Sequence, residues 1–457
     1  MALRSEDPPI AQACTLVLPS DGRFDSRAWR IAGSLAARGH HVTVLARSAP
    51  GLADREDHEA GYRILRVPVS AQAGLPRPLQ AMAGLARRRD RAATGGADEP
   101  LSLDSYRSAG DIRPTGLAAR IRAAIAGAWR LAAIALTVRS QRLASRPVAP
   151  RADIVHAMAY MGIAVGLDLG SRDHIPVVYD ARDVYVEARN IARLPGPARR
   201  LFAAIERRWA RRASRVMTVN RAYADVMAER FAVDRPAIVM NCPYRPAPHE
   251  EQTGSPRSRA IHERLELDEA VRIVLYHGGL SAERGIEQLI AALPLLPDDV
   301  HLVLLGYGPH AEALAEAARD PAHRGRLHVL PAVPPGELLT WVSGADIAAM
   351  PIQPSTLNHR LTTPNKLFEA MTAGVPVVAS DLPGMAAIVR ATGCGVLCDP
   401  TDPGAIAAAI RTILDAPLAV RTGYAAAGEA AARGAYSWEA QFEVLLAEYG
   451  RLTGRPW

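Results

Sequence analysis

Two charged side chains one helical turn apart, Lys366 and Glu369, carry the chemistry that this sequence predicts most directly. Lys366 lies in the first turn of a predicted helix, where free backbone N–H groups and the positive end of the helix dipole already favour an anion. Glu369 is an acceptor-only carboxylate that can accept hydrogen bonds from two hydroxyl groups of a ribose or a sugar. A cation for phosphate and an acceptor for a diol at this spacing suit a nucleoside diphosphate.

Lys366 is also the only lysine of the chain, which has 54 lysine and arginine residues in total. Lysine is a compact point charge, whereas arginine is a planar fork, so a retained lysine suits a single phosphate contact. The alternative is the chance survival of one lysine on an ordinary amphipathic helix.

The elements around this pair are predicted from caps and apolar runs. The helix spans Pro364 to Ala373, with Thr362 or Thr363 as its cap and Gly374 at its left-handed exit. The apolar run from Val375 to Ala379 predicts a short strand buried on both faces, as in a parallel sheet between helix layers.

A diglycine and a second cation occur earlier in the same half of the chain. Gly278 and Gly279 follow a predicted strand, and Arg284 stands where the next helix begins. A cation beside free N–H groups repeats the arrangement of Lys366 and suits a diphosphate. Farther on, Gly306 and Gly308 nearly match a dinucleotide fingerprint. No acid for a ribose follows the next strand, so we expect no nicotinamide site, and these glycines instead let the backbone approach another nucleotide.

Candidate polar residues also follow strands in the first half. Gly22 and Arg23 lie in the first loop, where they can meet a phosphate or an acceptor, although an ordinary solvated turn fits equally. His156 ends a strand and is a candidate catalytic or acceptor contact, with a satisfied core histidine as the alternative. Asp180 and Arg182 follow the next strand and are candidates for the acceptor side.

Strands and helices alternate in both halves, which predicts two Rossmann-like, doubly wound α/β domains that face each other across a cleft. A length of 457 residues suits two such domains. We place them at residues 1–250, with an insertion at 71–150, and at 251–435 after a linker. A final helix at 436–457 follows and crosses back to the first domain.

The net charge of +7 suits nucleic acid, an anionic membrane or phosphorylated substrates, and does not choose among them. No aromatic-interleaved basic motif is present, so we expect no nucleic-acid partner. A predicted Ala/Arg helix from Gly116 to Leu143 can lie on an anionic bilayer, but we favour its covering a sheet edge or extending the core.

Four scattered cysteines predict reduced, buried thiols in a cytosolic protein. The sequence has no signal-peptide core and no uncharged apolar run long enough to span a membrane. We therefore expect a cytoplasmic protein, with peripheral membrane contact as a second expectation. No Asp-x-Asp pair and no cluster at metal spacing occurs, so we expect no metal and no other cofactor.

The sequence resembles family 4 glycosyltransferases of the GT-B fold, in a PNKLFE-type bacterial branch, in three segments: HGGLSAERGIEQLI, HLVLLGYGP and PNKLFEAMTAGVPVVASDLPG. The family consists of retaining enzymes that use nucleotide sugars. The resemblance is strong over Arg272 to Asp402 and weaker over the first half. The closing YSWEAQFEVLLAEY resembles the family's C-terminal helix, which crosses back to the first domain.

Position by position, Glu369 matches the second glutamate of the family's Glu-x7-Glu motif, which implies binding of the donor ribose. Leu361 stands where the family has the first glutamate. Gly279 and Arg284 stand at the positions of the family's phosphate-binding arginine and lysine, and Lys366 supplies a compensating charge. The resemblance thus implies a donor-phosphate site with altered residues.

The resemblance implies transfer of a sugar, with retention, from a nucleoside diphosphate sugar to a sugar, a lipid-linked acceptor or a small molecule. The catalytic residues it implies are Arg284, Lys366 and His156, which matches half of a His-x-His motif. The predicted donor-binding residues are Gly278, Gly279, Gly306, Gly308, Thr363, Asn365, Lys366, Leu367 and Glu369. The alternatives are a nucleotide-sugar-binding protein without turnover and a sugar-nucleotide epimerase.

Overall fold

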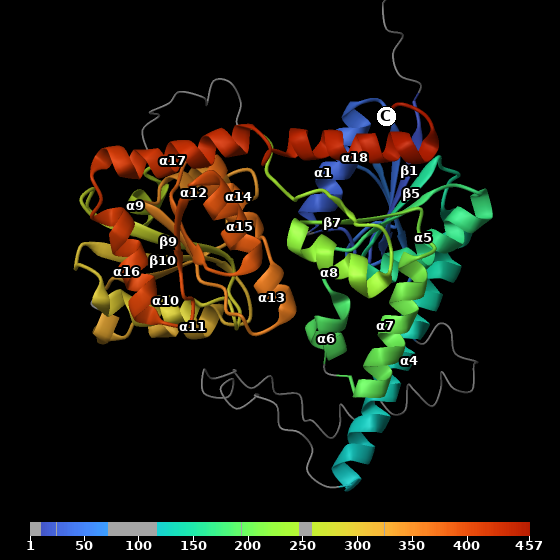
Figure 1. The fold of residues 1–457 in the computed structure, drawn as a ribbon, viewed down its shortest axis with the longest axis horizontal. Coiled ribbons are helices and arrows are strands. Elements are labelled where there is room, and N and C mark those ends of the chain that lie inside the picture. Colours follow the sequence, from blue (N-terminus) through green and yellow to red (C-terminus); the bar gives the residue numbers. More distant parts are fainter. Residues whose placement is uncertain (1–10, 24, 72–116, 193, 246–257, 324) are drawn as a thin grey trace, which may run out of the picture. The chain divides into compact units, whose positions relative to one another are not determined.

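The computed structural model describes residues 11–23, 25–71, 117–192, 194–245, 258–323 and 325–457, which form two compact α/β units (Figure 1). The first unit contains the described residues up to Val239 together with Phe442–Trp457. The second contains the described residues from Met240 to Gln441. Each unit has its own largely parallel sheet, which confirms the predicted fold class. The predicted domain boundaries stay predictions.

The sheet of the first unit has the strand order β3-β4-β2-β1-β5-β6-β7-β8. All neighbours are parallel except the edge strand β3 and its neighbour β4, two strands that the sequence did not predict. The strands are β1 (Ala13–Val17), β2 (His41–Arg47), β3 (Arg55–Asp57), β4 (Arg63–Val67), β5 (Ile154–Met158), β6 (Val177–Asp180), β7 (Arg215–Thr218) and β8 (Ala237–Ile238). The helices are α1 (Ser26–Ala37), α4 (Leu117–Val148), α5 (Ala159–Asp173), α6 (Arg189–Ala192), α7 (Gly196–Ala210) and α8 (Arg221–Phe231).

The second unit has a parallel sheet with the order β11-β10-β9-β12-β13-β14. Its strands are β9 (Arg272–Gly279), β10 (Val300–Tyr307), β11 (Leu327–Pro331), β12 (Ile347–Met350), β13 (Val377–Ser380) and β14 (Gly395–Cys398). Its helices are α9 (Ala260–Leu265), α10 (Ile286–Ala292), α11 (Ala311–Ala317), α12 (Leu338–Ser343), α13 (Leu357–Leu361), α14 (Asn365–Thr372), α15 (Pro383–Thr392), α16 (Pro403–Leu414) and α17 (Leu418–Arg433). The last helix, α18 (Trp438–Thr453), belongs to the first unit from Phe442 onward.

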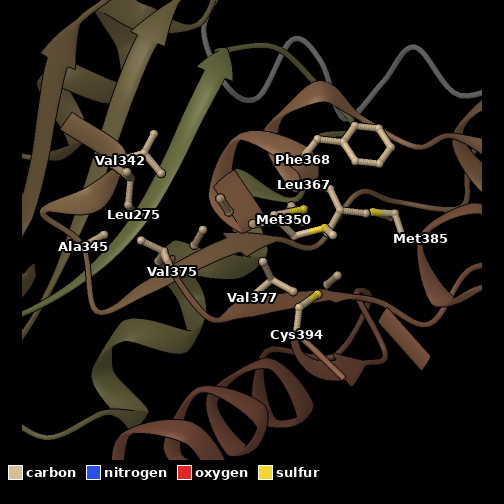
Figure 2. Close-up of a cluster of buried hydrophobic side chains, with 14 of the residues drawn as sticks. Leu275, Val342, Ala345, Met350, Leu367, Phe368, Val375, Val377, Met385 and Cys394 are labelled. Carbon is tan, nitrogen blue, oxygen red and sulfur yellow. The ribbon is translucent and has the colours of Figure 1, made fainter. Parts of the chain in front are cut away.

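The second sheet is buried on both faces, as its apolar strands predict. Along β9, Ile273 and Leu275 pack in one apolar cluster, whereas Val274 and Tyr276 pack in another. Figure 2 shows the first cluster, in which Leu367 of α14 lies among side chains of β12, β13 and α15. This packing fixes α14 beside the carboxyl ends of the strands.

Several expectations differ from the structure. The helix expected around Glu187 is a single 3-10 turn, Tyr185–Glu187, and α13 was not predicted. The helix expected from Gly116 to Leu143 is longer, because α4 continues to Val148. Most of the insertion and most of the linker lie outside the described residues. The four cysteines are free and buried, as predicted.

Candidate active site

The first turn of α14 carries Lys366 into the interior of the second unit. Pro364, in extended conformation, is the N-cap of α14 and makes no side-chain cap bond, so the predicted threonine cap is wrong. Thr362 instead ends α13. Proline fixes its own φ and disfavours a helical residue before it, so the chain enters α14 without a hydroxyl cap.

The Lys366 ammonium is buried without a hydrogen-bond acceptor. The residue is 9% exposed, and Nζ has no hydrogen-bond partner among the described residues. Nζ lies 3.5 Å from the centroid of the Tyr276 ring, a cation–π contact. Burial lowers the pKa of Lys366 well below its usual value, Arg284 lowers it further, and Glu369 raises it. A buried amine without an acceptor therefore favours its neutral form.

Glu369 lies one turn after Lys366 and pairs with a histidine that the sequence analysis missed. The Nε2 atom of His277 lies 2.9 Å from the Glu369 carboxylate. The His277 side chain is almost fully buried, whereas Glu369 retains 15% exposure. The histidine orients the carboxylate, and an exposed acceptor edge remains on Glu369. The only signal in the sequence was the position of His277 directly before the diglycine.

Tyr276, which the sequence did not indicate, contacts both Lys366 and Gly279. Its hydroxyl donates a hydrogen bond of 2.9 Å to the carbonyl of Gly279, and burial raises its pKa. A Cβ added at Gly278 would lie 3.6 Å from the Lys366 side chain, and one added at Gly279 would meet nothing within 4 Å. Space is therefore open beside the lysine at the end of β9.

Gly306 and Gly308 have a structural reason for being glycine. Gly306 pairs with Gly278 across β10 and β9, and a Cβ on Gly306 would lie 1.9 Å from the Gly278 carbonyl oxygen. A Cβ on Gly308 would lie 2.2 Å from the Leu280 carbonyl oxygen. Both glycines allow the close approach of two strand ends, and that approach shapes the loop that contains Gly278 and Gly279.

Arg284 lies in the loop before α10 rather than in its first turn, because Gly285 is the N-cap. Its charge lowers the pKa of both Lys366 and His359. The structure therefore brings the two predicted cations, Arg284 and Lys366, to the same end of the second sheet.

The remaining predicted donor contacts divide between core and surface. The side chain of Leu367 is fully buried in the apolar cluster of Figure 2, and its role in donor binding stays a prediction. Leu361 is buried as well. Asn365 is exposed, and its side-chain oxygen accepts a hydrogen bond from Asn241. Thr363 is half-buried in the segment that leads into α14.

In the first unit, His156 and Asp180 belong to a buried polar network with Arg27 and Tyr449. Arg27 donates to both carboxylate oxygens of Asp180, with distances of 2.6 and 3.1 Å. His156 contacts the Tyr449 hydroxyl at 2.7 Å and the Asp180 carboxylate at 3.1 Å. Burial alone raises the pKa of Asp180, but the charge of Arg27 and the contacts of His156 hold it well below its usual value.

This network changes the interpretation of two candidates. His156 and Asp180 have no exposed surface, and both ring nitrogens of His156 have partners. A buried, paired histidine fits the alternative of a satisfied core residue, and the structure offers no surface for the predicted catalytic contact. Asp180 likewise holds Arg27 rather than facing an acceptor. No sequence signal marked Arg27, because a buried arginine in an amphipathic helix resembles a surface one.

Of the other acceptor-side candidates in the first unit, Gly22 is buried, Arg182 is partly buried and Arg23 is exposed. Arg182 donates to Asp25 at 2.9 Å, and Asp25 also caps α1. Gly22 has a φ of +87° and accepts a hydrogen bond from the Trp29 indole. Arg23 is exposed and paired with Asp21. Within the described residues, no three His, Cys, Asp or Glu side chains are arranged to hold a metal ion.

Two family models match the chain, one in each half. Residues 25–243 match the model described as "Glycosyl transferase 4-like domain", and residues 271–416 match "Glycosyl transferases group 1". A D-inositol 3-phosphate glycosyltransferase from Xylanimonas cellulosilytica is 27% identical over 320 residues, which cover 66% of this chain and 73% of the relative.

Solved structures share the fold over nearly the whole chain. Sucrose-phosphate synthase from Thermosynechococcus elongatus has a TM-score of 0.67 at 18% identity, with 97% of this chain and 99% of that chain covered. Anabaena HepE in complex with UDP has a TM-score of 0.62 at 16% identity, with 96% and 100% covered. The chain therefore has the GT-B fold, and each of its halves matches a glycosyltransferase model.

Lys366, Glu369 and Arg284 all lie within the part of the chain that matches the group 1 model. Within the described residues of the chain, no single helix is long and apolar enough to cross a membrane. One bent pair, Pro403–Leu414 with Leu418–Thr453, meets the same length and composition criteria together.

Proposed function

We propose that this glycosyltransferase transfers a sugar from a nucleoside diphosphate sugar to its acceptor with retention of anomeric configuration. The observation that carries the proposal is the buried Lys366 ammonium, which has no acceptor among the described residues and lies next to Gly278, where an added Cβ would meet only the lysine side chain. An amine desolvated in this way is destabilised until an anion reaches it. The diphosphate of the donor is that anion.

The neighbours of Lys366 support the remaining donor contacts. Arg284, in the loop between β9 and α10, adds a second positive charge for the diphosphate. Glu369, oriented by His277, accepts the hydroxyl protons of the nucleoside ribose. The first turn of α14 contributes the positive end of its dipole.

In the proposed reaction the bond between the sugar and the leaving phosphate breaks on the face where the acceptor oxygen bonds. The acceptor's hydroxyl proton passes to the departing phosphate oxygen. Lys366 and Arg284 stabilise the charge that develops on the diphosphate, and the proposal requires no metal ion and no cofactor. The protein thus supplies position and charge rather than a nucleophile.

The acceptor is proposed to bind to the first unit near Gly22, Arg23 and Arg182. Two of the similar proteins, the D-inositol 3-phosphate glycosyltransferase and the sucrose-phosphate synthase, are named after a phosphorylated polyol and a phosphorylated sugar. Arginine guanidinium groups suit such phosphates. We therefore include D-inositol 3-phosphate and sugar phosphates, with lipid-linked sugars, among the acceptors to be tested.

The early part of α4, in the first unit, has features of a surface that contacts a membrane. Ile125 and Trp129 are 54% and 69% exposed, and exposed arginines lie nearby at positions 130 and 139. Farther along, Gln141 and Ser145 are fully buried, so that part extends the core as favoured from the sequence. We propose that the early part contacts anionic lipid at the cytoplasmic membrane face.

A thermal-shift panel of UDP-, GDP-, ADP- and dTDP-sugars tests donor binding, because a ligand that binds only the folded protein raises the unfolding midpoint. We expect one base to give a clear shift. Release of the nucleoside diphosphate that depends on an added acceptor then tests transfer. Binding without such release against every acceptor, with or without anionic vesicles, would favour a binding protein and contradict the proposal.

A further inference from the structure

We propose that Tyr276 is the positioning residue of Lys366, whose ammonium it holds ready at the end of β9 through its ring. The inference rests on the proposed function for its effect on donor binding. The contact between the Tyr276 ring and the Lys366 ammonium is given by the geometry of the two side chains and does not depend on that function.

The ring is rigidly placed. Tyr276 has no exposed surface and lies in the apolar cluster with Val274 and Leu304. Its hydroxyl is anchored to the Gly279 carbonyl at 2.9 Å, so both ends of the side chain are fixed. The aromatic face is thereby presented to Lys366 Nζ at 3.5 Å from the ring centroid.

The ring supplies an attraction that the surrounding charges do not fully provide. Arg284 opposes the charged form of Lys366, whereas Glu369 favours it but is itself paired with His277. Nζ has no hydrogen-bond acceptor in the described part of the chain. The negative face of an aromatic ring stabilises a desolvated cation substantially, and it leaves the N–H groups free for a phosphate.

A purely structural role for Tyr276 makes a different prediction. If the ring only fills the core, its replacement lowers stability without changing the charge state of Lys366. If the ring positions the ammonium, its loss lowers the pKa of Lys366, because the charged form loses its attraction. Phenylalanine keeps the ring and removes only the bond to Gly279, so Tyr276→Phe and Tyr276→Leu form a matched pair.

The single lysine allows a direct measurement. In full-length protein made with 13C-labelled lysine and no lysine in any tag, one side chain gives one set of NMR signals. We expect the Lys366 Hε signals to be shifted upfield by the ring in the native protein and in Tyr276→Phe, but not in Tyr276→Leu. We also expect the pKa of Lys366 in Tyr276→Leu to be lower than in the native protein by about 1. An unchanged pKa and unchanged shifts in Tyr276→Leu would overturn the inference.

The second measurement is the affinity for UDP, GDP and ADP between pH 6 and 9 by calorimetry. We expect affinity to fall as pH rises, and the fall in Tyr276→Leu to begin at a lower pH than in the native protein, with up to about 10-fold weaker binding where the two profiles differ most. Tyr276→Phe should follow the native profile. A uniform loss at every pH in Tyr276→Leu overturns the positioning role. Failure of all three nucleotides to bind the native protein overturns the proposed function instead, while the NMR result still decides the geometry.

Discussion

Lys366 is a buried cation whose partner, on the proposal above, arrives with the donor. Its first test is Lys366→Ala and Glu369→Ala, each of which should remove most of the thermal shift given by the stabilising nucleotide sugar. The fold should stay intact, because neither side chain belongs to the apolar clusters of the second unit. Differential scanning fluorimetry with and without ligand measures the shift.

Lys366→Met provides the control for this experiment. A thioether of similar length keeps the packing on Tyr276 and removes the uncompensated amine. We expect the ligand-free unfolding midpoint to stay the same or rise, whereas the nucleotide shift is lost. An undiminished shift in both alanine variants would mean that the donor site lies elsewhere.

His277 acts on the donor through Glu369 in this scheme. Replacing it by leucine removes the contact of 2.9 Å to the carboxylate and lets the acceptor edge rotate. We expect nucleotide affinity to fall about 10-fold, as for loss of a hydrogen bond to a charged group. His277→Gln retains an N–H donor and should recover most of the affinity. Equal affinities in calorimetry for the leucine variant and the native protein would exclude this role.

At the scale of elements, α7 packs on the first sheet through a buried acid. The Tyr179 hydroxyl donates a hydrogen bond of 2.7 Å to Glu206, which is almost fully buried. Burial raises the pKa of Glu206 to about 7, although Tyr179 and Arg230 oppose the shift. The folded state therefore retains a proton that the unfolded chain releases from pH 4.5 upward.

The raised pKa of Glu206 makes the stability of the protein depend on pH. The folded protein binds more protons than the unfolded chain between pH 4.5 and about 7, so the free energy of unfolding falls as pH rises through that window. The loss is at most about 3 kcal/mol. Glu206→Gln keeps an acceptor for Tyr179 and should be more stable than the native protein at pH 8.

Urea unfolding at pH 5 and at pH 8 measures this difference. The exposed acid of α8, Glu229, serves as the matched control, and Glu229→Gln should follow the native pH dependence. If Glu206→Gln loses the same stability as the native protein between the two pH values, Glu206 is not the group that titrates.

At the scale of the whole molecule, the end of the chain completes the first unit. Tyr449 of α18 is buried and bonds to His156 of β5, a residue 293 positions earlier in the sequence. The ring of Trp457 lies 5.0 Å from that of Tyr449. The network of Arg27, Asp180 and His156 therefore includes the last helix.

Tyr449→Phe leaves one nitrogen of a buried histidine without a partner. We expect a loss of about 1 to 3 kcal/mol in the first unit. Hydrogen exchange followed by mass spectrometry should show faster exchange in β5 and α18, with the second unit unchanged. Tyr244→Phe, at an exposed tyrosine, should leave exchange as in the native protein. Equal exchange in the two variants would contradict the structural role of the network.

The proposed contact of α4 with anionic lipid attaches the whole molecule to a membrane. Trp129→Ser should reduce cosedimentation with vesicles of anionic phospholipid several-fold, and binding should weaken as salt rises. Leu418→Ser, which replaces an equally exposed side chain on α17, should not change it. Native protein that fails to bind anionic vesicles at low salt would exclude the contact.

The sequence was sufficient for the order of strands in the second unit, whereas the short helices α9 and α13 and the helix α15 were not predicted. Apolar runs such as Val377–Ser380 and stop signals such as Gly374 act over a few residues, so local pattern determines them. Local sequence did not predict the elements whose structure depends on contacts with the rest of the fold. The edge strand β3 is three charged residues that gain their structure by pairing with β4, and the N-cap of α14 is the extended Pro364 rather than a threonine.

The sequence by itself determined that Lys366 is the single lysine, that it begins a helix after a strand, and that an acid follows one turn later. Only the tertiary structure decided that the lysine lies on Tyr276 and the acid on His277, because both partners come from β9, about 90 residues earlier. It also decided that His156 is a core residue. Burial depends on what the rest of the chain brings to a side chain, and local sequence does not encode that.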